Sequence, residues 1–385
     1  MELTFNQCAT LLTSITAQAT GRTSITPTNP GEFVSVATTA LETGYDTLIG
    51  AISQVLSKTI FSVRPYSRKF AGLTANEIRY GNHVRKLSVV DSAPDDNAEY
   101  KLEDGVNSDM FKVRKPSIVQ TNFYNAATYQ RHITIFKNQL DVAFSNAAEF
   151  GAFISMIVQN ASDQIEQDHE TCARFTLCNF IAGKIAGDPA NVIHLVTEYN
   201  AANGTEYTAE TVRKSENFPA FMRWALARIR TVSELMTERS TNFHINITGK
   251  PVARHTPLDK QRVYLHTPAV HTMETEVLST VYHDQYLKKV DFETVNFWQA
   301  LNSPDQIKIT AAYMGTDGAI QKKEVSVANV FGVVFDPEAL GITTVNSWTA
   351  SSPFNAAGGY TNMFFHYTDR YWNDFTENGV VLLLD

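Results

Sequence analysis

The chain has 385 residues, of which 43% are hydrophobic and 19% charged, and these ordinary globular values exclude an intrinsically disordered protein. Its 40 acidic side chains against 32 basic ones give a net charge of −8, which argues against a dedicated nucleic-acid binder, because such proteins carry a basic face. The N-terminus lacks the basic and apolar blocks of a signal peptide, and no run of apolar residues is long enough to predict a membrane span.

The first 60 residues predict short amphipathic helices joined by polar linkers. Residues 1–16 repeat apolar side chains at helical spacing, and a Thr/Pro/Gly/Asn-rich stretch follows. Residues 33–57 predict one or two further helices, broken near Gly44. Such small helices make poor cores by themselves. We therefore expect this segment to be ordered by neighbouring subunits, and to be needed for assembly but not for folding.

Residues 63–134 predict a long excursion of β-strands with segregated charge. Residues 61–90 hold six basic side chains against one acidic, whereas residues 91–109 hold seven acidic against one basic. An isolated two-stranded ribbon is marginal in water, so we expect a neighbouring chain to cover it. The alternative is a solvated ribbon whose charges only keep it soluble. The residues expected to contact an adjoining subunit are Arg79, Arg85 and Lys86 going out and Lys112, Arg114 and Lys115 coming back, around the acidic Asp95, Asp96, Glu103 and Asp104.

Residues 146–181 predict one long helix, about 54 Å at ~1.5 Å per residue. Gly183, Gly187 and Pro189 are expected to end it. The predicted buried stripe is Phe150, Phe153, Ile154, Ile157, Ala161, Ile165, Cys172 and Phe175, and the predicted solvent side is Glu166, Gln167, Glu170 and Arg174. This helix is either the centre of a large α+β domain or a structural spine that other chains pack across.

The remainder of the chain predicts a second helix, a mixed lobe and a closing hairpin. The helix runs from Pro219 to about Glu238, with Leu235 on its inner side. Residues 242–347 mix short strands, including residues 243–248, with a helical piece around residues 273–282. The tail reads as two strands around a Thr-Glu-Asn-Gly turn, a hairpin signal.

Motifs for catalysis are missing from the sequence: it has no phosphate loop, GxGxxG, HExxH or GxSxG. In the run Asp168, His169, Glu170 and Cys172, only His169 and Cys172 converge on a helix, and a solvated face is the simpler interpretation. A looser set, His255, His266, His271 and His283 with Glu274, is more simply scattered histidines. With Cys8 and Cys178, the cysteines form no CxxC pair and suggest neither a disulfide nor a zinc site. We expect no catalytic, cofactor or metal residues, and no enzyme.

Three stretches carry a resemblance to a known family. They are residues 68–80 (RKFAGLTANEIRY), residues 122–157 with their Phe-rich helix start, and GGYTNMFFHYTDRYW near the end. Together with the order of arm, charged β excursion, spine helix, second lobe and closing strands, they resemble the major capsid proteins of tailed bacteriophages, those of small podophages of the phi-twenty-nine kind in particular.

The resemblance implies the α+β Hong Kong 97 capsid fold. Its parts are an N-terminal arm (1–60), an extended loop (61–130), a peripheral domain with the spine (131–240 and 350–385) and an axial domain (241–349). It further implies pentamers and hexamers that close an icosahedral shell around double-stranded DNA, a portal protein, a separate scaffolding protein, assembly in the host cytoplasm, and no cofactor or membrane. The acidic net charge suits a shell that does not grip DNA. Two alternatives stay open: an encapsulin-like nanocompartment, which shares the fold, and an enzyme with an unrecognised site in residues 190–350.

Overall fold

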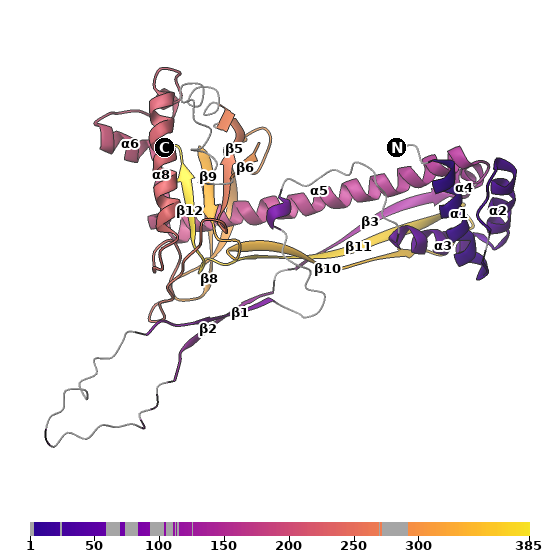
Figure 1. Cartoon of the computed structure of the whole chain (residues 1–385), viewed down its shortest axis with the longest axis horizontal. Helices are drawn as coiled ribbons and strands as arrows, with labels where there is room; N and C mark the ends of the chain where they lie inside the picture. Colours follow the sequence, from indigo (N-terminus) through magenta and orange to yellow (C-terminus); the bar gives the residue numbers. More distant parts are fainter. Residues whose placement is uncertain are drawn as a thin grey trace. The chain divides into compact units, whose positions relative to one another are not determined.

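A computed structural model of the chain forms two compact units (Figure 1). The first comprises Met1–Gly81, Asn125–Cys172 and Ile342–Arg370, and the second Asn82–Tyr124, Ala173–Gly341 and Tyr371–Asp385. The residues that the structure describes are 4–23, 25–58, 70–73, 84–92, 104, 111, 113, 115–124, 126–268, 270–271 and 292–385.

The first unit begins with three helices, α1 (Phe5–Thr20), α2 (Pro30–Glu42) and α3 (Tyr45–Lys58). Local sequence sets their ends. The Gln7 side chain accepts a hydrogen bond from the Thr4 backbone N–H at 2.9 Å, and α1 ends at Gly21, whose φ of 69° is the left-handed conformation that glycine adopts readily. The Asn29 side chain caps α2 just before Pro30, a residue suited to a first helical turn.

These helices pack on their own chain, so the expectation that only neighbouring subunits order the arm is wrong. Leu12 and Phe33 are fully buried in one apolar cluster with Phe150, Ile154 and Met363 from later in the sequence. The Phe33 ring lies 5.8 Å from the Phe150 ring, edge to face. The small helices make a poor core by themselves, as the sequence indicates, but the start of the spine helix and the sheet complete it.

A three-stranded antiparallel sheet, in the order β10-β11-β3, supports the first unit. Its strands are β3 (Ala126–Phe136), β10 (Leu340–Ser351) and β11 (Tyr360–Asn373). The short α4 (Lys137–Ala143) and the long α5 (Ala147–Gly187) follow β3, and α5 runs along the sheet (Figure 1). Arg131 of β3 holds Asp168 of α5 with two hydrogen bonds of 2.6 and 2.8 Å, which fixes helix to sheet.

The long helix α5 exists as predicted, but its buried face changes along its length. Ile157 is buried, whereas Ile165 is only half-buried and Phe175 is 51% exposed. Glu170 and Arg174, predicted on the solvent side, are buried. From residue 173 onward the helix belongs to the second unit, whose side chains surround it, so a single stripe does not describe both parts. The Arg174 guanidinium lies 3.8 Å from the centre of the Phe297 ring, which explains how its charge is accommodated there.

Gly183 does not end α5, although the sequence predicts a helix end there. The helix continues through Gly183 to Gly187. A Cβ at Gly183 would lie 2.4 Å from the Phe375 ring, so the missing side chain lets that ring pack directly against the helix backbone. Phe375 in turn stacks on Phe180, with ring centres 5.5 Å apart. Gly183 is therefore a packing position and not a helix stop.

Two isoleucines of α5 give a matched test of this burial. Ile157→Ala should lower the free energy of unfolding by ~2–5 kcal/mol, because it removes buried methyl groups and leaves a cavity. Ile165→Ala should cost clearly less, since Ile165 already contacts solvent. Denaturant unfolding of the unassembled subunit measures both values. Equal losses for the two variants would contradict the burial described here.

The second unit is built on a five-stranded sheet in the order β4-β12-β9-β5-β6. Its strands are β4 (Val192–His194), β5 (Arg262–His266), β6 (Phe292–Val295), β9 (Val330–Phe335) and β12 (Gly379–Leu383). The helices α6 (Leu195–Asn203), α7 (Ala209–Val212) and α8 (Phe218–Leu235) contribute to one core with it; Phe221 and Met222 of α8 share that core with Val334 and Leu382. Figure 1 shows α8 alongside this sheet.

The second unit also contains two antiparallel strand pairs. One is β7 (Ile307–Met314) with β8 (Ile320–Val327), and the other is β1 (Val84–Val89) with β2 (Ile118–Phe123). Short 3-10 turns occur at Ala71–Leu73 in the first unit and Pro189–Asn191 in the second. Residues 243–248 form no strand, and Leu235 is 47% exposed, so both of those expectations are wrong. The helical piece predicted around residues 273–282 lies outside the described residues.

The predicted C-terminal hairpin is wrong. β11 pairs antiparallel with β3, whereas β12 pairs parallel with β4 and antiparallel with β9. The two strands thus belong to different sheets, although only Asp374–Asn378 separates them. The polar side chains of this segment do not form a hairpin turn. Asp374 and Glu377 instead contact Lys86 of β1.

Candidate functional site: the ribbon and its charged anchor

The β1–β2 pair, called the ribbon from here on, has two chemically different faces. Its register places Val89 opposite Ile118 and Lys86 opposite Thr121. Side chains along β1 alternate between partly buried and exposed, as expected of a strand with one face covered. Lys86 and Ser88 are on the covered face, and Leu87 and Val89 are on the other.

The covered face is held by charged groups of the second unit, called the anchor: Arg254, Glu338, Asp374 and Glu377. The Lys86 ammonium lies 3.1 Å from both Glu338 and Asp374 and donates a hydrogen bond to Glu377. The Arg254 guanidinium lies 3.0 Å from Glu377 and donates to the Ser88 hydroxyl at 2.7 Å. Lys86 and Ser88 thus fasten β1 to its own chain.

Burial makes these contacts strong. Asp374 and Glu377 are 2% and 5% exposed. Burial by itself would lower the pKa of Lys86, but the carboxylates of Asp374, Glu377 and Glu338 outweigh it and raise that pKa above its ordinary value. Burial raises the pKa of Glu377, and Lys86 partly opposes this. Since an unpaired buried charge is costly, Lys86 and the buried carboxylates of Asp374 and Glu377 stabilise one another.

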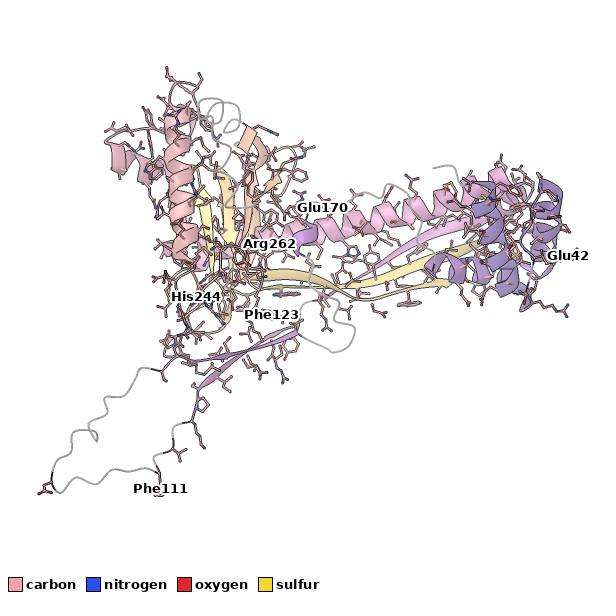
Figure 2. The ribbon with its side chains drawn as sticks, viewed as in Figure 1. Glu42, Phe111, Phe123, Glu170, His244 and Arg262 are labelled. Carbon is pink, nitrogen blue, oxygen red and sulfur yellow. The ribbon has the colours of Figure 1, made fainter. Side chains whose placement is uncertain are left out.

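The loop Asp374–Asn378 is folded to present the anchor. The Asp374 carboxylate accepts hydrogen bonds from the Thr376 backbone N–H at 2.9 Å and from its hydroxyl at 2.6 Å. Asn378 lies 3.1 Å from a ring nitrogen of His244, a residue labelled in Figure 2. Burial lowers the pKa of His244, which favours its neutral form. The segment that resembled a hairpin turn is therefore a polar socket for Lys86.

A second fastening lies just beyond the end of β1. The Asp91 carboxylate accepts a hydrogen bond from the Ala253 backbone N–H at 2.5 Å and another from the Arg239 guanidinium. The Ala253 hydrogen bond is the main reason that the pKa of Asp91 lies below its usual value. The ribbon is thus held at both Lys86 and Asp91.

The opposite face of the ribbon is apolar and exposed. Leu87, Val89 and Ile118 are 59%, 63% and 53% exposed. Val89 and Ile118 are direct cross-strand partners, so these side chains form one continuous surface. Arg85 alternates in register with Leu87 and Val89 and adds positive charge to this face, and Lys115, just before β2, is also exposed. Among the described residues of the same segment, Phe111, labelled in Figure 2, is 84% exposed.

A model of one protein family matches residues 12–383, nearly the whole chain. This chain belongs to the Phi29-like phage major capsid proteins. This is the family that the sequence resembles, and the match does not support the alternative of an encapsulin. No curated protein sequence matches this one.

Solved structures show the same fold as this capsid protein. The capsid structure of Staphylococcus phage Andhra matches with a TM-score of 0.54 at 11% identity, over 84% of this chain and 86% of that chain. The structure of the head fiber and inner core protein gp22 of native bacteriophage P68 matches with a TM-score of 0.54 at 9% identity, over 85% of this chain and 87% of that one. The expected α+β Hong Kong 97 capsid fold is confirmed.

The residues predicted to contact an adjoining capsid subunit have different surroundings. Arg85 and Lys115 are exposed, whereas Lys86 is held by the anchor of its own chain. Arg79, Lys112 and Arg114 lie outside the described residues, as do Asp95, Asp96 and Glu103; Asp104 is exposed. The anchor residues were not singled out from the sequence. Lys86 and Glu377 are 291 positions apart, and no local pattern connects them.

Two of the residues considered as metal ligands in this capsid protein have structural partners. Asp168 binds Arg131 and Tyr367, and the His169 ring lies 2.5 Å from Asp369 of β11. Cys172 is buried. His283 and Glu274 lie outside the described residues.

Among the helices that the structure describes, none is long and apolar enough to cross a membrane.

Proposed function

We propose that this capsid protein closes an icosahedral shell of pentamers and hexamers around double-stranded DNA, without catalysing a reaction, and that the ribbon joins one copy to the next. One observation carries this proposal: the ribbon is anchored to its own chain on one face and presents Leu87, Val89 and Ile118 on the other. Exposed apolar surface of this kind marks a protein contact. In a protein whose family builds shells, a second copy is the natural partner.

The other parts of the proposal follow from the family. We assign residues 1–60 to an N-terminal arm, 61–130 to the extended loop, 131–240 with 350–385 to a peripheral domain, and 241–349 to an axial domain. A separate scaffolding protein and a portal protein complete the proposed assembly. The net charge of −8 supports packaged DNA that is enclosed without tight binding.

Charge on the ribbon gives a test. The double variant Arg85→Glu with Lys115→Glu should reduce shell formation, because it reverses the exposed charges while leaving Lys86 and its anchor intact. Each exposed pair is worth only ~0–1 kcal/mol, but a shell repeats every contact many times. Wild-type assembly should also weaken as salt shortens the screening length below ~10 Å, near 0.1 M. Electron microscopy and sedimentation measure shell yield.

The matched control is Lys322→Glu with Lys323→Glu on the exposed part of β8, which makes the same change in net charge on a strand outside the ribbon. Circular dichroism should be unchanged for both pairs. Normal shell yield from the ribbon variant at all salt concentrations would show that Arg85 and Lys115 are merely solvated. Equal loss from the control would show that net charge, and not the ribbon, governs assembly.

A further inference from the structure

The chain contains two Asn–Gly pairs, Asn203–Gly204 and Asn378–Gly379. In such a pair the glycine backbone nitrogen can attack the side-chain carbonyl carbon of asparagine, and the attack is little hindered because glycine has no Cβ. The surroundings of the two pairs differ. Asn203 is exposed at the end of α6, whereas Asn378 is 1% exposed and lies directly before β12. The fold therefore gives different environments to two sites of the same intrinsic reactivity.

The reaction at Asn378 needs only water. The Gly379 nitrogen forms a bond to Cγ of Asn378 and loses its proton, and the side-chain nitrogen leaves as ammonia, which closes a succinimide ring. Water then opens the ring. Cleavage between Cγ and the nitrogen gives aspartate. Cleavage between the backbone carbonyl carbon and the nitrogen gives isoaspartate, whose main chain runs through the former side chain and is one atom longer.

Hydrogen bonds hold the reacting groups of Asn378–Gly379 apart in the folded protein. The Gly379 N–H donates to the Phe243 carbonyl at 2.8 Å. Asn378 Oδ1 lies 3.1 Å from His244 Nδ1, and Asn378 Nδ2 lies 3.2 Å from the Thr256 hydroxyl oxygen. The strand that follows, β12, pairs with both β4 and β9. Attack on Cγ thus requires these contacts to break together, which is an opening of the second unit and not of a loop alone.

The Asn203–Gly204 pair is held only by the end of a helix. The Gly204 N–H donates to the Asn200 carbonyl at 2.8 Å, and Asn203 Nδ2 donates to the Tyr199 carbonyl at 2.9 Å. Both contacts belong to the last turn of α6, and helix ends open at little cost in free energy. A carboxylate formed at Asn203 would also contact solvent. This pair therefore serves as an internal reference.

Either product at Asn378 conflicts with the folded second unit. Gly379 is packed so closely that a Cβ there would lie 2.6 Å from the Phe180 ring, so the extra main-chain atom of isoaspartate displaces this glycine from the place where it fits. Both products also put a new carboxylate into the loop that already holds the buried Asp374 and Glu377. An added buried charge without a partner is costly.

We propose that Asn378–Gly379 is a site of spontaneous succinimide formation that disables any subunit whose second unit stays unfolded, and that the folding of β12 protects it. The site is a chemical age limit on unfolded chains. A subunit that folds promptly keeps its asparagine, and one that remains open loses the ability to complete its sheet.

Ageing of the unfolded full-length chain tests the site. The chain is held in guanidinium at mildly alkaline pH for increasing times and then returned to native buffer. The soluble and aggregated pools are digested, and fragmentation mass spectrometry distinguishes asparagine, aspartate and isoaspartate. We expect isoaspartate at Asn378 to be about tenfold or more enriched in the aggregated pool, because the modified chain fails to refold. Isoaspartate at Asn203 should be equal in the two pools.

Two variants are the matched controls. Asn378→Ser removes the reacting amide, so its refolding yield, relative to its own value before ageing, should not fall with time. Asn203→Ser should lose yield as wild type does.

The protein kept folded for the same period completes the test. Asn378 should convert about tenfold or more slowly than Asn203 there, whereas the two should convert at similar rates in guanidinium. Equal isoaspartate at Asn378 in the soluble and aggregated pools, or equal conversion of the two asparagines in the folded protein, would overturn the inference. None of these readouts involves shells, so the proposed shell function is tested separately.

Discussion

Replacing Lys86 by methionine is expected to lower the free energy of unfolding by ~3 kcal/mol, the lower end of the range for breaking a buried ion pair. Methionine keeps much of the side-chain volume but leaves the buried carboxylates of Asp374 and Glu377 without their ammonium partner. Denaturant unfolding of the unassembled subunit measures the loss. The matched control is Lys115→Met, an exposed lysine in the same segment, which should change stability by no more than ~0.5 kcal/mol.

Two further measurements separate the ion pair from simple loss of packing. Adding Glu377→Gln to Lys86→Met should recover part of the stability, because it removes one uncompensated charge. The folded pKa of Lys86 lies above its ordinary value of 10.5, so its contribution is complete below that pH and is lost as pH rises through the raised value. The difference between wild type and Lys86→Met should therefore shrink in strongly alkaline solution, and also in acid, where Glu377 and its neighbours lose the negative charge that Lys86 pairs with. A difference that was constant at every pH would contradict a stabilising charge.

Phe33→Ala is expected to destabilise the isolated subunit by ~3–5 kcal/mol, the cost of truncating a buried phenylalanine. The Phe33 ring is fully buried between the Phe5 and Phe150 rings, at 6.1 and 5.8 Å, so its loss leaves a cavity where arm and spine helix meet. Val34→Ala, at the next position of α2 and 42% exposed, is the control and should cost far less. Thermal unfolding of monomeric protein distinguishes the two.

This experiment also decides what the arm does before assembly. If the arm were ordered only by neighbours, Phe33→Ala would leave the monomer as stable as wild type and impair only shells. The packing of Leu12 and Phe33 predicts instead that Phe33→Ala destabilises the monomer itself. For the same reason, deletion of residues 1–30 should expose the apolar cluster around Phe150 and cause aggregation. A stable, non-aggregating monomer lacking residues 1–30 would refute this account of the arm.

The fold was predictable where one element has one set of neighbours. The first turns of α5 and most of α8 carry apolar residues at helical spacing, and both helices form. The predicted faces fail in the later part of α5. Ile165 and Glu170 depart from them within the first unit, and past residue 172 α5 enters a second environment in which Arg174 is buried beside Phe297 while Phe175 is exposed. Periodicity reports the average face of a helix and cannot show that its surroundings change.

The candidate site was predictable only in part, for a related reason. Alternating residues and segregated charge located the ribbon and drew attention to Arg85 and Lys115. They could not separate Lys86 from these two, because its difference lies in the distant Asp374 and Glu377. Glu377 also belongs to the Thr-Glu-Asn-Gly stretch that predicted a C-terminal hairpin: such a stretch between strands has the composition of a hairpin turn, whether or not the strands pair. Partners far apart in sequence decide both cases.

The position of β12 has a consequence for the order of events during synthesis. It lies between β4 and β9 in the five-stranded sheet, although it is made after every other strand of that sheet. Until Gly379–Leu383 have left the ribosome, the hydrogen-bonding edges of β4 and β9 have no strand between them and the core below α8 lacks Val380 and Leu382. A nascent chain therefore cannot present a finished second unit, and premature termination before residue 379 yields a product that lacks an internal strand of this sheet. We therefore expect that only subunits translated through β12 can complete the fold of the second unit and join a shell.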